Sequence, residues 1–457
     1  MHREPRPEDR RLGTRRDLYA AAAAILLVAA AIVIGHWIEE RDGTLRVSWP
    51  PLYANWLPHV GPGTPAALAV AVLLVAYGPP LAARLPWRGL LAASYAAASA
   101  WTWSLALIDG WHWGIARRLT TKYEYLQVID RFQNIPETLR EFTRFILLDS
   151  PDHWPAHIAG HPPAATVTFV LLDRIGLGGG AWAGVWCLVV GATTCVAVLV
   201  TVRALASEQL ARRAAPFLVL APASVWAGTS ADGYFAAVAA WSVALLALAV
   251  TSRRPWPRRT AACGAGLLFG LTCYLSYGLT LYAVIGLTVL LLGHGHGHGR
   301  ERWRVLPYVL VGLVVVPAVF TAYGFNWWEA YRLLVERYYQ GAAGVRPYAY
   351  WVWANLACTV LVVGLATVAG LRRAGGVLRE RSFRTPRARL ALLLAGALLA
   401  LLIADLSGMS KAETERIWLP FAMWLLAAGA FLPRARPWLV AQGVLALTVN
   451  HLLLTGW

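Results

Sequence analysis

Apolar runs of about twenty residues recur through this chain, the first beginning at residue 18 and the last ending at residue 455. A helix needs about 20 apolar residues to cross the hydrocarbon core of a bilayer, and only helices and closed barrels satisfy their backbone there. Of the 457 residues, 58% are apolar and 14% are charged, whereas about a quarter are charged in soluble proteins. The sequence therefore predicts an all-α, polytopic membrane protein.

The runs predict about 13 transmembrane helices and one short re-entrant or juxtamembrane element, residues 164–176, which is too short to span. The chain then divides into a basic tail (1–17), two leading helices (18–88), a core (89–330) that includes the loop 109–163, and C-terminal helices (331–457) that include the loop 408–417. The predicted spans are residues 18–37, 64–82, 89–108, 181–202, 214–230, 233–251, a hairpin of two over 260–293, 305–323, 350–371, 390–407, 418–432 and 438–455.

Lys and Arg gather in short clusters between the apolar runs, and the first cluster lies within residues 1–17. Cytoplasmic loops of membrane proteins carry such an excess of Lys and Arg. The pattern predicts a plasma-membrane protein whose N-terminus is cytoplasmic and whose loop 109–163 and C-terminus lie outside. Because these orientation signals account for the net charge of +17, no nucleic-acid partner is expected.

The longest polar interval of the chain is the loop 109–163, and long structured loops tend to carry function. Within it, Pro136 suits the first turn of a helix, and apolar residues recur at helical spacing among charged ones over 137–148. This amphipathic helix either lies flat in the membrane interface or packs against the rest of the loop. The interfacial arrangement is favoured beside a bilayer.

Acidic residues of the outer loops are the candidate catalytic groups, because a carboxylate can take a proton from a hydroxyl nucleophile. Asp109 ends an apolar run, Glu124 lies between two tyrosines, and Asp232 follows Ser230. Asp109 and Glu124 are rival candidates for the base. The alternatives are a helix cap for Asp109 and an N-cap for Asp232.

A guanidinium can hold two phosphate oxygens in a bidentate pair and stabilise the charge that builds on a leaving phosphate. Basic, aromatic and acidic side chains in the same outer loops are therefore candidates for substrate binding, with solvated loop residues as the alternative. They are Arg117, Arg118, Tyr123, Tyr125, His161, Lys411, Glu413 and Arg416.

Histidine alternates with glycine at His294, His296 and His298. Such tracts can bind metal, but this one falls on the predicted inner side, where a plain loop is the favoured interpretation. The predicted outer loops contain no Asp-x-Asp pair. No cofactor and no metal site are predicted, and a divalent metal is possible but not implied.

Four short motifs follow one another along the predicted core. They are Asp109 at the start of the loop, His161-Pro162-Pro163 at its end, Asp232 after the next helices, and a Gly-rich stretch at 266–271. Their order resembles the GT-C superfamily, the integral membrane glycosyltransferases that use polyprenyl-phosphate sugars, such as protein and lipid mannosyltransferases. The chain departs from that pattern in its two leading helices and in Ser276-Tyr277 at the hairpin break, where related enzymes place Lys.

The resemblance implies an inverting glycosyltransferase that moves a sugar from a polyprenyl-phosphate donor to an acceptor hydroxyl of a glycan, lipid or protein at the outer membrane face. The alternative is a transporter or flippase of a lipid-linked cell-envelope precursor, which would place charged residues along the middle of several spans. Such mid-span charges are nearly absent here. The enzyme interpretation also requires Asp109 or Glu124 to meet Asp232 and Arg416 in one outer site.

Overall fold

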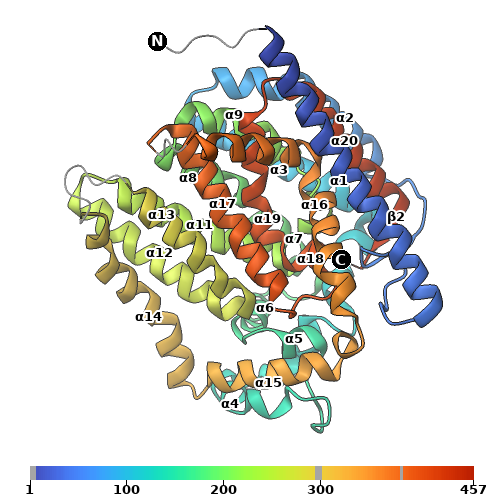
Figure 1. Ribbon diagram of the computed structural model, residues 1–457. Coiled ribbons are helices and arrows are strands. Elements are labelled where there is room, and N and C mark those ends of the chain that lie inside the picture. The colour runs from blue at the N-terminus through green and yellow to red at the C-terminus, as the bar shows by residue number, and fades with distance from the viewer. Residues whose placement is uncertain (1–6, 294–300, 381–383, 457) are drawn as a thin grey trace.

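The computed structural model describes residues 7–293, 301–380 and 384–456, and its regular structure is almost entirely helical (Figure 1). Eight of the described helices are long and apolar enough to cross a membrane, and two shorter apolar helices accompany them. The predicted all-α, polytopic architecture is confirmed. Residues 1–6 of the predicted basic tail and the His-Gly repeat at 294–298 lie outside the described residues.

The helices that carry the eight long apolar stretches are α1 (Pro7–Asp42), α2 (Thr64–Arg84), α3 (Trp87–Ala106), α7 and α8 (Gly180–Gly191 and Thr193–Leu205), α11 (Ala231–Thr251), α14 (Leu306–Ala322), α16 (Tyr348–Arg379) and α17 (Pro386–Leu406). The remaining helices outside the loop 109–163 are α6 (Ala164–Arg174), α9 (Glu208–Val219), α10 (Ser224–Ala227), α12 (Pro255–Leu275), η6 (Tyr277–Leu281), α13 (Tyr282–Leu292), η7 (Glu301–Val305), α15 (Trp327–Gln340), η8 (Ala342–Gly344), α18 (Thr414–Ile417), α19 (Leu419–Leu425), η9 (Leu426–Phe431) and α20 (Ala435–Leu452).

Every predicted span coincides with one of these helices or with two in succession. The predicted count of about 13 spans stays a prediction, because α9, α12 and α20 are not among the eight long apolar helices. The short element expected at 164–176 is α6, which has 11 residues. At 1.5 Å per residue it is about 17 Å long, so it cannot span a hydrocarbon core about 30 Å thick.

Helix α11 occupies the centre of the bundle, and 83% of its most apolar stretch is buried. Beside it, α12 and α14 pack closely because both carry glycine at the contact: a Cβ on Gly266 would overlap the carbonyl oxygen of Val309, and one on Gly312 would overlap that of Cys263. Small residues allow such close approach between membrane helices. This packing gives the Gly-rich stretch at 266–271 a structural role.

The two leading helices are integral parts of the bundle. Helix α1 runs along α16 (Figure 1), and at one end the buried carboxylate of Asp17 pairs with Arg372 at 2.7 Å and with Arg373 at 2.6 Å. Helix α16 is interrupted at Gly364, whose φ of 77° favours glycine. These contacts fix the N-terminal helix against the rest of the protein.

The loop 109–163 folds into short segments that lie between the ends of the bundle helices and α15 (Figure 1). Leu139, Phe142 and Ile146 of the predicted amphipathic helix are buried, and the backbone carbonyl of Phe142 accepts a hydrogen bond from the Trp154 indole at 2.8 Å. The apolar side of this segment therefore packs within the protein, which is the alternative arrangement weighed from the sequence. The segments of the loop are η1 (Leu107–Asp109), the π-helical η2 (His112–Ala116), η3 (Arg118–Thr120), η4 (Tyr125–Phe132), α4 (Ile135–Glu141), η5 (Phe142–Phe145) and α5 (Ala156–Gly160).

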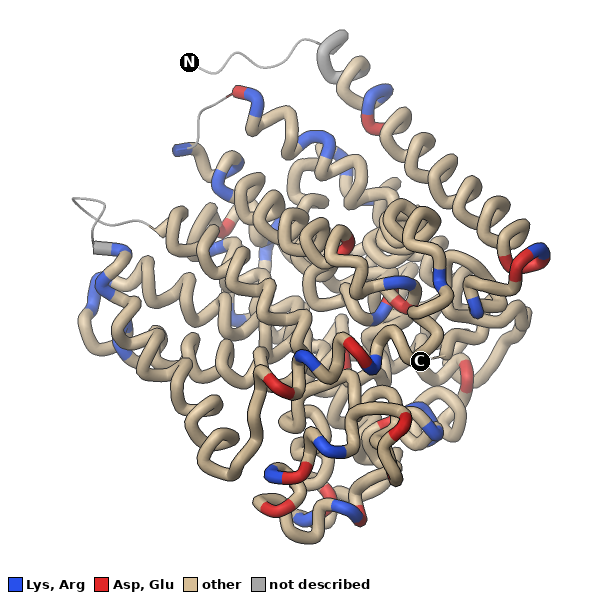
Figure 2. Tube along the Cα trace, turned by 60° about the horizontal axis from the view of Figure 1, so that its bottom comes forward, with Lys and Arg blue, Asp and Glu red and all other residues tan. Residues whose placement is uncertain are grey.

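A two-stranded antiparallel sheet joins the loop after α1 to the end of α20. Strand β1 (Ala54–Trp56) pairs with β2 (Leu453–Thr455), and Asn55 stands opposite Leu454. Charged residues of both signs gather over the part of the molecule that contains the loop 109–163 and α15, whereas the helices are largely uncharged along their lengths (Figure 2). Lys and Arg also gather at the opposite end of the bundle (Figure 2), so the mixture of both signs is what marks the loop end.

Candidate functional site

A buried ion pair stands at the centre of the loop end. Arg416 Nη1 lies 2.6 Å from Asp232 Oδ2, and Arg416 Nη2 lies 3.3 Å from Glu413 Oε2 and 3.2 Å from His157 Nε2. His157 Nδ1 in turn lies 2.9 Å from Glu124 Oε1. Glu124, His157, Arg416, Asp232 and Glu413 thus form one connected network, called the central cluster below.

The local sequence explains why Asp232 faces this cluster. Ser230 is the N-cap of α11, and its hydroxyl accepts a hydrogen bond from the Asp232 backbone N–H at 3.1 Å. Since Ser230 satisfies an N-terminal donor of the helix, the Asp232 carboxylate is left to pair with Arg416. The N-cap alternative for Asp232 is wrong, because Ser230 takes that role.

Arg416 reaches the cluster from a tight turn at the start of α18. Ala412 and Glu413 both have positive φ, 73° and 62°, which turns the chain sharply before the helix begins. Burial opposes the charge of the Arg416 guanidinium, but Asp232, Glu413 and Glu124 outweigh it and raise the Arg416 pKa above its usual range. Arg416 therefore stays charged inside the protein.

Glu124 and His157 come from two segments of the loop that are tied together by their backbones. The His157 N–H donates to the Tyr123 carbonyl at 3.0 Å, and Pro155 precedes the short helix α5 that carries the imidazole. Glu124 Oε2 is buried and has no hydrogen-bond partner among the described residues. An unpaired buried carboxylate oxygen is costly, so this atom is suited to receive a hydroxyl proton from a ligand.

Tyr125 places a second buried polar atom next to Glu124. Its ring stacks on Phe169 at 5.5 Å, and its hydroxyl has no partner in the described part of the chain. Burial, followed by the negative charges of Asp232 and Glu124, raises the Tyr125 pKa well above its usual value. The hydroxyl therefore remains protonated and can donate a hydrogen bond.

His161 completes the polar lining of the central cluster. Its Nδ1 lies 2.7 Å from the His157 carbonyl, and its ring packs near Tyr125 and Phe235, with centroids 5.8 Å away in both cases. Burial lowers the His161 pKa to about 4, although Asp232 acts in the opposite direction. His161 is therefore neutral near pH 7.

Asp109 belongs to a second polar cluster. Its Oδ1 lies 2.8 Å from His59 Nε2, and its Oδ2 lies 2.6 Å from Arg118 Nη2. Arg118 Nη1 also donates to the Thr455 carbonyl in β2 at 2.6 Å. Both carboxylate oxygens of Asp109 are therefore engaged, and through Arg118 they fix the start of the loop to β2. Of the two rival candidates for the base, Glu124 is the one that lies with Asp232 and Arg416.

The remaining predicted binding residues lie around these clusters. Arg117 is exposed and stacks over Trp113 at 4.1 Å, while the exposed Tyr123 ring lies 5.0 Å from Lys122 Nζ. Lys411 Nζ donates to the Ala343 carbonyl at 3.0 Å. The structure thus brings together Glu124, Tyr125, His161, Asp232, Glu413 and Arg416, and leaves Arg117, Tyr123 and Lys411 outside that network.

Sequence reasoning missed residues that hold the clusters in place. His157 bridges Glu124 to Arg416, and its only signal in the sequence is its spacing of four from His161, the residue that follows the short helix α5. Glu415 is completely buried, and it accepts the Tyr53 N–H at 3.0 Å. Burial raises the Glu415 pKa.

The part of the chain that the structure describes shows no preformed metal site. Within residues 7–293, 301–380 and 384–456, no group of three or more His, Cys, Asp or Glu side chains is arranged to hold an ion. The repeat at His294, His296 and His298 lies outside these ranges.

Solved structures similar to this chain include the oligosaccharyltransferase of Archaeoglobus fulgidus in a complex with zinc and sulfate. The identity is 16% and the TM-score is 0.49, over 78% of this chain and 53% of that chain. They also include ArnT from Cupriavidus metallidurans in the apo state (17% identity, TM-score 0.41, 67% of this chain and 54% of that chain). No family model matches the chain, and no curated protein matches its sequence.

ArnT bound to undecaprenyl phosphate is a further similar structure, with 15% identity and a TM-score of 0.42, over 72% of this chain and 59% of that chain. The chain spans about half the length of the solved chains it matches.

Proposed function

We propose that the chain is an integral membrane glycosyltransferase that moves a sugar from a polyprenyl-phosphate donor to an acceptor hydroxyl, with inversion, on the outer face of the plasma membrane. The observation that carries this proposal is the central cluster. In it, a carboxylate with an unpaired buried oxygen, Glu124, is linked through His157 to the ion pair of Asp232 and Arg416.

Glu124 is the proposed general base. Its Oε2 takes the proton of the acceptor hydroxyl, and His157, whose Nδ1 lies 2.9 Å from Oε1, orients the carboxylate. The hydroxyl oxygen forms a bond to the anomeric carbon from the face opposite the lipid phosphate. The bond from that carbon to the phosphate oxygen breaks, its electron pair goes to the phosphate, and the configuration is inverted.

Charge in the cluster suits this reaction. Positive charge develops at the anomeric carbon in glycosyl transfer, and Asp232 and Glu124 supply nearby negative charge. Arg416 and Lys411 are proposed to stabilise the negative charge on the departing lipid phosphate. The Tyr125 hydroxyl and neutral His161 offer hydrogen bonds to the sugar, since both lie beside Glu124 and Asp232.

Helix α15 is proposed to hold the protein surface at the depth of the lipid headgroups. Trp328 is 72% exposed and Tyr339 is 50% exposed, and such aromatic residues concentrate at membrane–water interfaces. The helix is tied to the loop, because the Gln340 side chain accepts the Leu148 N–H at 2.9 Å. A polyprenyl chain in the bilayer would then present its phosphate at the level of the central cluster.

Sugar transfer by the purified protein in lipid vesicles tests the proposal. Radiolabelled polyprenyl-phosphate hexoses and pentoses are supplied with glycan, lipid and peptide acceptors, and the wild type is compared with Glu124→Gln and with Asp130→Asn, an exposed acid of the same loop. Transfer that is lost in Glu124→Gln and kept in Asp130→Asn supports the proposal. Folded protein that transfers no sugar but moves a lipid-linked precursor between leaflets would establish the transporter alternative.

A further inference from the structure

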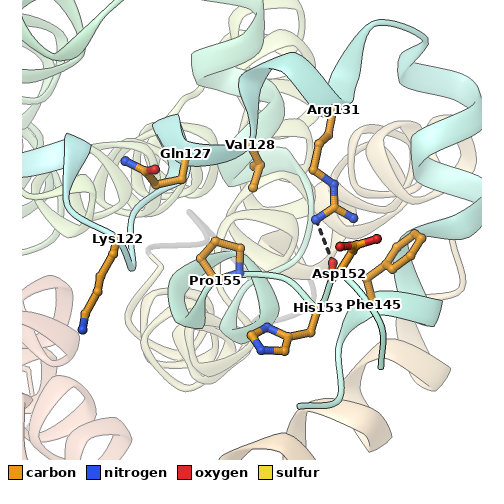
Figure 3. Close-up of a pocket in the computed structure, with 8 residues that line it drawn as sticks. All are labelled: Lys122, Gln127, Val128, Arg131, Phe145, Asp152, His153 and Pro155. Atoms are coloured by element: carbon orange, nitrogen blue, oxygen red, sulfur yellow. Dashed lines mark hydrogen bonds between the residues drawn. The ribbon is translucent and has the colours of Figure 1, made fainter. Parts of the chain in front are cut away.

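An open pocket of about 610 Å³ lies in the loop 109–163. In Figure 3, the side chains of Arg131 and Asp152 lie together on one side, Lys122 lies on the opposite side, and Pro155 lies between them. The pocket is lined by Lys122, Gln127, Val128, Arg131, Phe145, Asp152, His153 and Pro155.

Arg131 is held rigidly at the edge of this pocket. Its guanidinium lies over the Trp154 ring at 3.6 Å and over the Phe145 ring at 4.8 Å, and Nη1 donates to the Asp152 carbonyl at 2.9 Å. Trp154 is itself completely buried. These contacts hold the Arg131 side chain in place, so little of its conformational entropy would be lost on binding.

Several polar atoms of the pocket make no hydrogen bond or ion pair within the described residues. They are Lys122 Nζ, which lies over the Tyr123 ring at 5.0 Å, the Asp152 carboxylate, and the N–H groups of Arg131 other than the one that donates to the Asp152 carbonyl. Gln127 uses only its Nε2, which donates to the Thr120 carbonyl at 2.7 Å. Donors and acceptors are thus interspersed around one hollow.

This arrangement selects a class of ligand. A sugar hydroxyl donates and accepts at once, so an array of mixed donors and acceptors with a few apolar faces fits a saccharide. A lipid chain would desolvate Lys122 and Asp152 without replacing their water. A peptide bound as an added strand needs a free strand edge, and the pocket walls come from the helical segments η4 and η5 and their loops.

Two segments of the loop connect the pocket to the proposed base and to His157. Lys122 precedes Glu124 by two residues, and Pro155 precedes His157 by two residues. The hydrogen bond from the His157 N–H to the Tyr123 carbonyl holds these two segments side by side. A saccharide in the pocket would have its neighbouring ring near Glu124.

We propose that this pocket is the acceptor subsite and that the acceptor is a glycan, bound through a ring next to the one that is glycosylated. The inference rests on the proposed function, and it narrows the acceptor from glycan, lipid or protein to a carbohydrate. Lys122, Gln127 and Asp152 are the specificity-determining contacts.

The experiment combines transfer kinetics with direct binding. Four kinds of acceptor are compared: a hexose trisaccharide, a pentose trisaccharide, a hydroxyl-rich peptide and a hydroxylated lipid. Each is offered to the wild type, to Lys122→Ala and to Asp152→Asn. The control variant is Arg144→Ser, because Arg144 lies outside the pocket. Asn tolerates the positive φ of 54° at residue 152. Saturation-transfer NMR measures trisaccharide binding without donor, and release of donor sugar to water reports the donor site.

The expected result is that a trisaccharide is the preferred acceptor and that Lys122→Ala and Asp152→Asn each raise its KM about tenfold, as for loss of a hydrogen bond to a charged group. Arg144→Ser should keep the wild-type KM. Unchanged KM and NMR binding in the pocket variants, or preference for peptide or lipid, would overturn the inference. Pocket-dependent trisaccharide binding without any sugar transfer or release would uphold the pocket and overturn the proposed function instead.

Discussion

Arg416 Nη1 lies 2.6 Å from Asp232 Oδ2, and only 5% of each side chain is exposed to solvent. The two residues are 184 positions apart in the chain. The pair therefore joins α18 to the start of the central helix α11. Removing Arg416 leaves the buried Asp232 carboxylate without its counterion.

Replacing Arg416 with alanine is expected to destabilise the protein by about 3–5 kcal/mol, the usual cost of breaking a buried pair. Arg416→Lys should recover part of that stability because it keeps the charge. Denaturant titration in mixed micelles measures the free energy of unfolding of both variants. The control is Arg144→Ala, whose partner Glu141 is on the surface and whose own side chain is 72% exposed, so stability should scarcely change. A stable Arg416→Ala protein would contradict the structural role of the pair.

Glu124→Gln is expected to lower kcat by about 10²–10⁴-fold, the usual contribution of a general base. The amide keeps the size of the side chain, so thermal stability in detergent should remain near that of the wild type. His157→Gln should lower kcat by less, because the imidazole acts by orienting Glu124. If His157→Gln lost more activity than Glu124→Gln, the proposed roles of the two residues would be exchanged.

Asp109→Asn separates the two rival bases. Because Asp109 pairs with Arg118 and His59, its neutralisation is expected to cost roughly 3 kcal/mol of stability. Turnover per folded molecule should stay within about twofold, a difference of only ~0.4 kcal/mol in the activation free energy. Folded fraction and kcat are measured on the same preparation. A large fall in kcat with full folding would make Asp109 the base.

Acid is expected to destabilise the loop through His161. Its pKa in the folded protein, about 4, lies below the value near 6.5 expected in the unfolded chain. The unfolded state therefore binds more protons between these pH values, and stability falls as the pH drops from about 6.5 towards 4. The melting temperature of His161→Gln should fall less over this range than that of the wild type. Equal slopes would contradict the neutral, buried state of His161.

The sequence alone located the long apolar helices and the loop between them, because both depend on local composition. It could not tell which of Asp109 and Glu124, two acids of the same loop, lies with Asp232 and Arg416. Their placement depends on the turn at Gly110, with φ of 75°, and on the π-helical segment that returns Arg118 to Asp109. Neither has a clear signal in residue order.

The amphipathic pattern at 137–148 also could not show, from the sequence alone, what its apolar side packs against. Its spacing is equally suited to lipid and to protein, and the choice is made by partners distant in sequence, such as Phe325, which packs edge-on against Phe142 at 5.7 Å. His157 was overlooked for a related reason. It lies in an apolar stretch, and its role arises only when α11 and α18 bring Asp232 and Arg416 to it.

The hydrogen bond from Arg118 to Thr455 spans 337 positions of the chain. During synthesis, Arg118 is made long before its partner, and Asp232 precedes Arg416 by 184 residues, or about 10–40 s at ordinary translation rates. Both clusters must therefore stay open while most of the bundle is inserted. A nascent chain arrested before α18 would expose Asp232 and Glu124 without their counterion, and quality-control proteases could recognise that unfinished state.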